Sequence, residues 1–294
     1  MFQGEIAALS AAALWAFATL MFGRLGKQLS PLALNLIKGF MAIGFIVLTL
    51  AIRQQLLASL PVESVLLLLI SGVVGIGLGD TAYFATVNIL GARQALLLEM
   101  LAPPMAALMS WVFLQEQLSF LAWLGMALTL TGIIWVVGER SPKVRGTQSK
   151  PLLTRGILFG ILAALGQSIG SVLSRAALAD TVMDPLWSTL LRLSAGLVCI
   201  GGLFLWRRKE QTLTRPSGRL LGGVAIAAFF GTYLGIWLQQ IALKYSPTGI
   251  AQSLLATSPI MVLPMALVIG ERITLRAVCG AVVALGGIWL LFSR

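Results

Sequence analysis

The second half of this 294-residue chain repeats the first half, at offsets of about 152 to 156 residues. The segment Gly75-Ile-Gly-Leu-Gly79 corresponds to Gly231-Thr-Tyr-Leu-Gly235, and the stretch from Pro104 to Glu116 corresponds to the one from Pro259 to Glu271. An internal repeat of this length predicts that the chain folds into two halves built on one plan.

Apolar segments of membrane-spanning length make up most of both halves. Hydrophobic residues account for 58% of the chain and charged residues for 11%, against about 25% charged in soluble domains. The apolar runs are about 18 to 24 residues long, the length that a helix needs to cross some 30 Å of hydrocarbon. The sequence therefore predicts an all-α polytopic membrane protein with ten transmembrane helices, at residues 4–22, 31–52, 64–88, 92–113, 119–138, 153–175, 185–206, 218–242, 247–269 and 273–292.

The repeat also predicts how the two halves are oriented. Residues 1–138 and 153–294 each contain five predicted spans, and a basic, polar linker at 139–152 separates them. Because five is an odd number, the second half must cross the membrane in the direction opposite to the first. Two inverted five-helix repeats are a common plan of secondary transporters, whose substrate sites lie between the halves.

The distribution of basic residues predicts the orientation in the membrane. Fifteen Lys and Arg residues lie in the loops after odd-numbered spans, whereas only Arg53, Arg175, Lys244 and Arg294 lie on the other side. Since basic loops stay in the cytoplasm, this count places both termini outside a cell (inner) membrane.

The composition also argues against several other classes of protein. The net charge of +11 comes from short basic loops without an interleaved aromatic face, so no nucleic-acid partner is expected. The chain has no histidine, and Cys199 and Cys279 both lie in apolar runs, so neither a metal site nor a cofactor is expected. No phosphate-binding loop of an ATP-driven pump is present.

The chain resembles the ten-helix, EamA-type members of the drug/metabolite transporter superfamily. In the first half the resemblance rests on Gly75–Gly79 with Asp80-Thr-Ala-Tyr-Phe84, on Leu90-Gly-Ala-Arg-Gln-Ala95, on Ala102-Pro-Pro104 through to Glu116, and on Gly125 to Gly132. In the second half it rests on Ser246-Pro-Thr-Gly-Ile-Ala251, Thr257-Ser-Pro259 and Ile269-Gly-Glu271. The resemblance implies a carrier that exports or exchanges amino acids, other metabolites or drugs. Many relatives are drawn with cytoplasmic termini, against the charge count above.

Four ionisable residues lie inside predicted spans, namely Lys38, Asp80, Glu99 and Arg192. Each is a functional candidate, because an ionisable side chain in hydrocarbon costs several kcal/mol. Lys38 and Arg192 occupy equivalent repeat positions, so both could line a central cavity and bind a carboxylate or phosphate of the substrate. Two other interpretations are that the four residues form buried ion pairs, or that the two cations extend toward the membrane surface.

Glu99 is the first candidate for proton coupling, and Asp80 is the second. Desolvation favours the neutral form of a carboxylic acid, and with no histidine in the chain a carboxylate is the group that can take up a proton. Other interpretations stay open: an intramembrane enzyme with Asp80 and Glu99 as paired catalytic carboxylates, or a structural or regulatory membrane subunit. We expect the protein not to be an enzyme.

Prolines and polar residues within the spans complete the candidate site. Pro103, Pro104 and Pro259 should bend or loosen the fourth and ninth spans, as hinges or as static kinks. The paired glycines of the third, sixth and eighth spans predict close helix packing. Candidate substrate contacts at mid-span, besides Lys38 and Arg192, are Trp15, Asn35, Tyr83, Asn88, Gln167, Ser168, Trp237, Gln239, Gln240 and Gln252.

Together these features predict a secondary-active transporter, an exporter or exchanger of a small polar metabolite such as an amino acid or an organic anion. It would work by alternating access between the inverted halves. Its expected partners are a small-molecule substrate, the lipid bilayer and a coupling proton. It would act as a monomer or a homodimer.

Overall fold

The computed structural model describes residues 2–25, 31–56, 60–137, 150–206, 217–268 and 274–293. This part of the chain contains ten helical segments long and apolar enough to cross a membrane, and it contains no strand. The predicted all-α, ten-span architecture is therefore confirmed. Six spans are continuous: α1 (Gln3–Leu25), α2 (Pro31–Ile52), α7 (Phe120–Val137), α8 (Lys150–Leu178), α9 (Pro185–Trp206) and α14 (Leu275–Phe292).

The other four spans are interrupted, two in each half. The third span consists of α3 (Val62–Ser71), the π-helix η1 (Gly72–Gly79) and α4 (Asp80–Leu90), and the eighth of α10 (Gly218–Ala227), η3 (Ala228–Leu234) and α11 (Gly235–Tyr245). The fourth span is divided into α5 (Ala92–Glu99) and α6 (Ala102–Leu114), and the ninth into α12 (Thr248–Leu255) and α13 (Ser258–Val268). Both kinds of interruption thus occur at corresponding spans of the two halves.

Most predicted boundaries lie within a few residues of the observed ones. A difference occurs at α8, which begins at Lys150, inside the predicted linker 139–152. Pro151 is compatible with this earlier start, because proline fits the first turn of a helix, where its missing N–H is not needed. Residues 138–149 lie outside the described part of the chain, as does Glu271.

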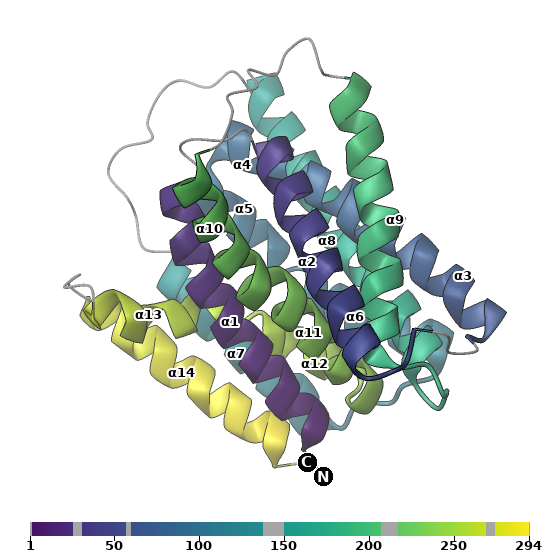
Figure 1. The fold of residues 1–294 in the computed structure, drawn as a ribbon. Helices are drawn as coiled ribbons and strands as arrows, with labels where there is room; N and C mark the ends of the chain where they lie inside the picture. The colour runs from purple at the N-terminus through teal and green to yellow at the C-terminus, as the bar shows by residue number, and fades with distance from the viewer. Residues whose placement is uncertain are drawn as a thin grey trace.

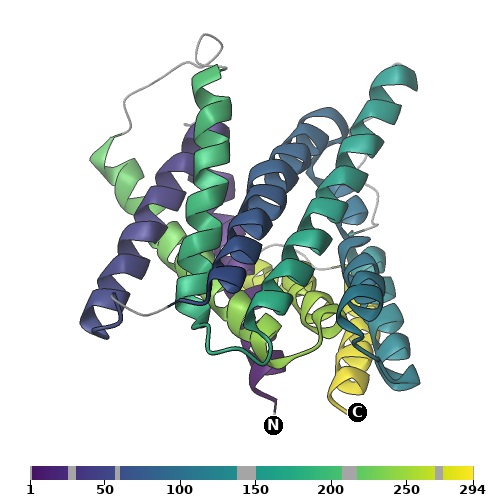
Figure 2. The ribbon, with the colours of Figure 1, turned by 90° about the vertical axis from the view of Figure 1, so that its right-hand side faces the viewer.

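The spans form one bundle whose two chain ends lie at the same end (Figures 1 and 2). We call the end that holds Phe2 and Ser293 the terminal end. The connections after α2, α6, α8 and α11 also lie there, and α1 ends and α2 begins at the opposite end. An even number of spans requires this arrangement.

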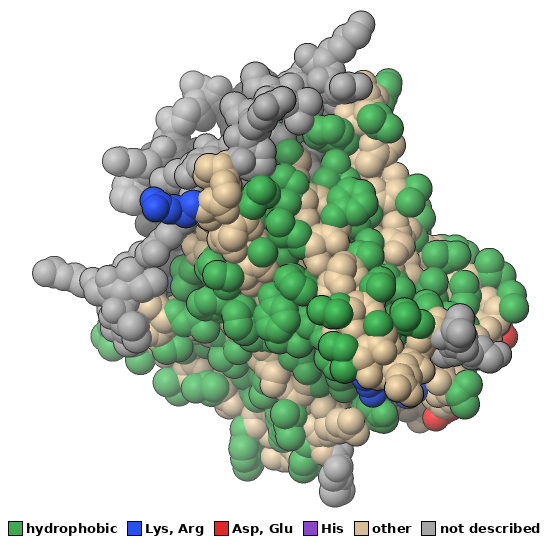
Figure 3. All heavy atoms as spheres, viewed as in Figure 1, with side chains coloured by type: hydrophobic (Ala, Val, Ile, Leu, Met, Phe, Trp, Pro, Cys, Tyr) green, Lys and Arg blue, Asp and Glu red, His purple; other side chains and the backbone are tan. Residues whose placement is uncertain are grey.

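The outer surface of the bundle is apolar. Hydrophobic side chains cover the face shown in Figure 3, and the visible charged side chains lie toward its edges. Large side chains such as Phe40, Val198 and Trp289 are exposed along the helices. An apolar belt of this extent suits hydrocarbon, since soluble monomers rarely expose large contiguous apolar patches.

Glycines bring the third and sixth spans into direct backbone contact. A Cβ on Gly170 would lie 3.1 Å from the Cα of Gly75, and a Cβ on Gly166 would lie 3.0 Å from the Cα of Gly79. Side chains at these positions would force the helices apart, so the predicted packing role of these glycines is confirmed. This seam joins the first half to the second beside the centre of the bundle.

The last spans of the halves form a second close pair, α7 against α14. A Cβ on Gly132 would lie 2.5 Å from the carbonyl oxygen of Gly280, and one on Gly125 would lie 2.9 Å from that of Gly287. Because the two helices run antiparallel, Gly132 faces Gly280 and Gly125 faces Gly287, so each glycine lies against the repeat counterpart of the other.

The broken fourth and ninth spans lie where the prolines predict. Met100 and Leu101 separate α5 from α6, and Pro103 follows in the first turn of α6. Ala256 and Thr257 separate α12 from α13, and Pro259 follows in the first turn of α13. The predicted loosening of both spans is confirmed, whereas a hinge function stays a prediction.

Candidate functional site

A cavity of about 610 Å³ lies between the two halves. Its walls come from α1, α2, η1, α4, α5 and α6 of the first half and from α8, α9, η3, α11, α12 and α13 of the second. None of the residues described in α7 and α14 lines it. A volume in this range suits a small organic molecule, because ligand pockets usually measure about 300–1,000 Å³.

All four ionisable residues predicted from the sequence line this cavity. Asp80 interacts electrostatically with both Lys38 and Arg192, and Glu99 interacts electrostatically with Asp80. The cavity wall therefore carries two cationic and two acidic side chains from within the apolar spans. Because Lys38 and Arg192 both line the cavity, their positions argue against the interpretation that these two cations extend toward the membrane surface.

Arg192 is the most deeply buried of these charges. Its residue is 1% exposed, and its Nε and Nη1 atoms have no hydrogen-bond partner. The guanidinium group lies beside η1, where its Nη2 atom is 3.3 Å from the position that a Cβ on Gly75 would take. Gly72 allows the backbone of α9 to approach η1 closely, because a Cβ at Gly72 would overlap the carbonyl group of Arg192. The glycines of η1 thus make room for a buried cation, two of whose three nitrogen atoms have no hydrogen-bond partner.

Most of the predicted polar and aromatic contacts also line the cavity: Trp15, Asn35, Tyr83, Gln167, Gln239 and Gln252. The indole N–H of Trp15 donates to the carbonyl of Gly231 in η3, at 2.9 Å, so Trp15 also joins the two halves. Trp237 does not line the cavity. It stacks on Tyr233, with 5.9 Å between ring centroids, and packs in a core shared by α2 and α9.

Three polar lining residues were not among the predicted contacts: Thr19, Thr232 and Ser258. Thr19 follows Trp15 by one helical turn, so it lies on the same face of α1. Ser258 directly precedes Pro259 at the break of the ninth span. Thr19 could have been predicted from the α1 face that Trp15 occupies, and Ser258 from the helix break at Pro259.

The two helix breaks contribute to the cavity wall. Pro103 and Pro259 line the cavity, whereas Pro104 does not. The hydroxyl of Ser168 on α8 donates to the carbonyl of Ala102, at 3.0 Å, and so holds the start of α6. The carbonyl groups four residues before a proline lack their usual helical donor, since proline has no N–H.

The cavity extends toward the end of the bundle opposite to the terminal end. Asn35 lines it near the start of α2, and Leu96 lines it near the start of α5. Toward the terminal end it stops at Gln252, whose amide nitrogen bonds to the hydroxyl of Ser171 at 2.5 Å.

Among the described residues, no group of three or more His, Cys, Asp or Glu side chains could hold a metal ion. The chemistry that the cavity offers is therefore that of two cations, two carboxylic acids, amides, hydroxyls and aromatic rings. Such a set can bind a polar molecule and exchange protons with it or with water.

Comparisons with known proteins agree with this architecture. The model of the EamA-like transporter family matches residues 2–138 and 154–293. An uncharacterised transporter of Archaeoglobus fulgidus is 26% identical over 286 residues, which cover 96% of this chain and 95% of that protein. An uncharacterised protein of Pseudomonas aeruginosa is 33% identical over 137 residues, or 47% of this chain, and the chain spans 45% of that protein. A solved crystal structure covers 98% of the chain at a TM-score of 0.81 and 18% identity, and supports the fold.

Proposed function

Because the chain belongs to the EamA-like transporter family and is a membrane transporter, we propose that it is a secondary-active exporter or exchanger of a small polar metabolite. The observation that carries this proposal is the cavity, which lies between apolar spans and is walled by both halves of the chain. A carrier needs such a central site, which movement of the halves can expose to either side.

The corresponding interruptions of the two halves support alternating access between inverted repeats. A π-helix occurs in the third and eighth spans, and a proline break occurs in the fourth and ninth. All four interrupted spans line the cavity. We propose residues 1–138 and 153–294 as the two repeats, with the proline breaks at Pro103–Pro104 and Pro259 as hinges.

Arg192 supports a substrate with an anionic group, such as an amino acid or an organic anion. Its Nε and Nη1 atoms are buried without partners, and leaving charged donors unsatisfied is costly. A carboxylate or phosphate would satisfy them with charge-assisted hydrogen bonds. Lys38 would add positive charge across the cavity, and Trp15, Asn35, Tyr83, Gln167 and Gln239 would contact the remainder of the substrate. Trp237 lies outside this set.

Glu99 and Asp80 support coupling to a proton gradient. Both carboxylic acids line the cavity and interact electrostatically with each other. Binding a proton at one would change the field at the other and at Arg192, which also interacts with Asp80. In this proposal Glu99 takes up and releases the coupling proton, with Asp80 as the second choice.

A ligand screen followed by an uptake assay tests the transport function. Small carboxylates, amino acids and phosphorylated metabolites that bind the purified protein should raise its unfolding temperature, because ligands of the native state stabilise it. Such compounds should then exchange across proteoliposomes, with counterflow of labelled compound at least tenfold above protein-free vesicles. If stabilising compounds bind without any counterflow, a regulatory or structural role is favoured over transport.

Reporter fusions test the orientation, which we propose from the charge count. With both termini outside a cell (inner) membrane, alkaline phosphatase fused after Arg294 should be active, because it folds in the periplasm. The same reporter inserted in the 139–152 linker should be inactive. The reverse pattern would contradict the orientation and leave the ten-span fold intact.

A further inference from the structure

Glu116 and Arg175 form a half-buried ion pair at the terminal end of the bundle. Arg175 Nε and Glu116 Oε1 are 2.6 Å apart, and the two side chains are 16% and 12% exposed. Glu116 follows α6 in the first half, and Arg175 lies near the end of α8 in the second. The pair therefore joins the two halves at the end away from the open part of the cavity.

The same two side chains also bond to the ends of two further helices. Arg175 Nη1 donates to the carbonyls of Leu243 and Lys244 in the last turn of α11, at 2.9 and 2.6 Å. Glu116 Oε2 accepts the N–H of Thr248, the first residue of α12, at 2.9 Å. These are groups that a helix leaves unsatisfied at its ends. We call Glu116, Arg175 and these three backbone groups the clasp.

The clasp lies next to the cavity, on the side of the terminal end. The Gln252–Ser171 hydrogen bond lies at the limit of the cavity on this side. Arg175 follows Ser171 by four residues on α8, and Thr248 precedes Gln252 by four on α12, so each clasp residue lies one turn, or about 6 Å, further toward the terminal end. On α11 the cavity residue Gln239 precedes Leu243 by the same spacing.

We propose that the clasp is the gate that closes the cavity toward the terminal end. This inference rests on the proposed transport function. Separating α11 and α12 from α6 and α8 opens this side and breaks the bonds of Arg175 to Leu243 and Lys244 and the bond of Glu116 to Thr248. The Glu116–Arg175 ion pair holds both side chains in position for these bonds. Removing one charge leaves the other charge unpaired and weakens the contact to the helix end that the replaced side chain holds, so the closed state is weakened.

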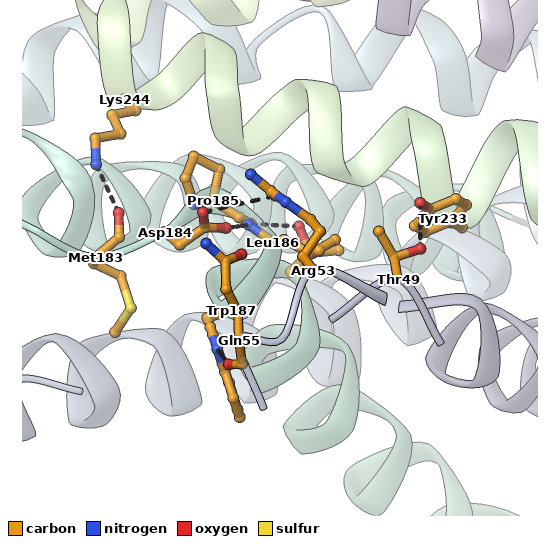
Figure 4. Close-up of polar contacts among 11 residues, drawn as sticks. Thr49, Arg53, Gln55, Met183, Asp184, Pro185, Leu186, Trp187, Tyr233 and Lys244 are labelled. Carbon is orange, nitrogen blue, oxygen red and sulfur yellow. Dashed lines mark hydrogen bonds and ion pairs between the residues drawn. The ribbon is translucent and has the colours of Figure 1, made fainter. Parts of the chain in front are cut away.

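A second ion pair at the same end provides a matched control. Figure 4 shows Arg53 beside Asp184, with Trp187 donating to the Gln55 carbonyl and Lys244 donating to the Met183 carbonyl. Arg53 and Asp184 are 3.9 Å apart and 42% and 31% exposed. Exposed pairs contribute little, so loss of this one should not open the cavity.

The experiment measures access to the cavity from each side of the membrane. The parent protein carries Cys199→Ser and Cys279→Ser, to remove its two cysteines, and Ala256→Cys as a reporter on the cavity wall. It is reconstituted in vesicles of known orientation and treated with a charged, membrane-impermeant maleimide. The parent should react from the opposite side and only slowly from the terminal-end side.

Glu116→Gln and Arg175→Gln should each speed labelling from the terminal-end side at least tenfold, whereas Arg53→Gln should change it less than twofold. The charge swap Glu116→Arg with Arg175→Glu should not restore the parent rate, because the exchanged side chains cannot make the bonds to Thr248, Leu243 and Lys244. Arg175→Lys keeps the charge but has fewer hydrogen-bond donors, so it should give an intermediate labelling rate. This variant replaces Arg175→Gln in the experiment if the glutamine variant does not fold.

Two outcomes would overturn the gate while leaving transport intact. Unchanged labelling rates in both glutamine variants would show that the clasp is a static structural contact and not a gate. Recovery of the parent labelling rate by the charge swap would show that only the ion pair matters, and not its bonds to the helix ends. Labelling from neither side in any variant would instead contradict the transport function, because water must reach a carrier's cavity from at least one side.

Discussion

Replacing Arg192 with glutamine should weaken binding of an anionic substrate about tenfold to 100-fold without lowering the stability of the ligand-free protein. A charged hydrogen bond contributes about 1.5 to 3 kcal/mol, which sets the loss of affinity. The ligand-free protein should unfold at the same or a higher temperature, because the substitution removes a buried cation whose Nε and Nη1 atoms have no partner. Thermal unfolding with and without the carboxylates found by the screen measures both quantities.

Two further variants make this result specific. Arg155→Gln removes an exposed arginine of α8 and should change neither quantity. Arg192→Lys keeps the charge but not the guanidinium geometry, and should recover only part of the affinity. A fall of several degrees in the unfolding temperature of the ligand-free Arg192→Gln protein would contradict the prediction. Arg192 would then be a structural partner of Asp80.

Replacing Glu99 with glutamine should abolish substrate accumulation driven by a pH gradient and leave substrate binding within about threefold of the parent. Glutamine keeps the shape of the side chain and removes its proton exchange. Since binding and exchange need no net proton movement, exchange should continue. Uptake into proteoliposomes, with and without an imposed pH gradient, separates the two activities.

Glu63→Gln is the matched control, because Glu63 is an exposed acid in the first turn of α3 and lies outside the cavity. Asp80→Asn tests the second-choice carboxylate in the same assay. If both Glu99→Gln and Asp80→Asn transport with unchanged pH dependence, neither residue couples transport to protons. The protein would then be a uniporter or an exchanger.

The ten spans and the cavity charges could be predicted from sequence because the bilayer dictates both. Hydrocarbon thickness sets the length of each apolar run, and the cost of charge in hydrocarbon singles out residues such as Lys38 and Arg192. Gly75 and Gly170 were predictable as packing residues for a similar reason, since only small residues allow helix backbones to touch.

The side chains around η3 could not be assigned to a face in the same way. A π-helix has hydrogen bonds from residue i to i+5, so residues after it are rotated relative to a continuous α-helix. The sequence gives no sign of η3, and this helps to explain why Trp237 lies in a core while Thr232 lines the cavity. The partners of Glu116 were equally hidden, because Arg175 and Thr248 come from two helices far away in the sequence.

The breaks of the fourth and ninth spans imply that part of the cavity's polarity belongs to the main chain. Pro103, Pro104 and Pro259 cannot donate to the carbonyls of Glu99, Met100 and Leu255, and all three of these residues line the cavity. Substituting those three lining side chains would leave the carbonyl acceptors in place. The residues to change are instead the prolines, because any other amino acid there restores an N–H that can occupy a carbonyl. Alanine at these positions should therefore reduce the number of carbonyl acceptors available at residues four places earlier.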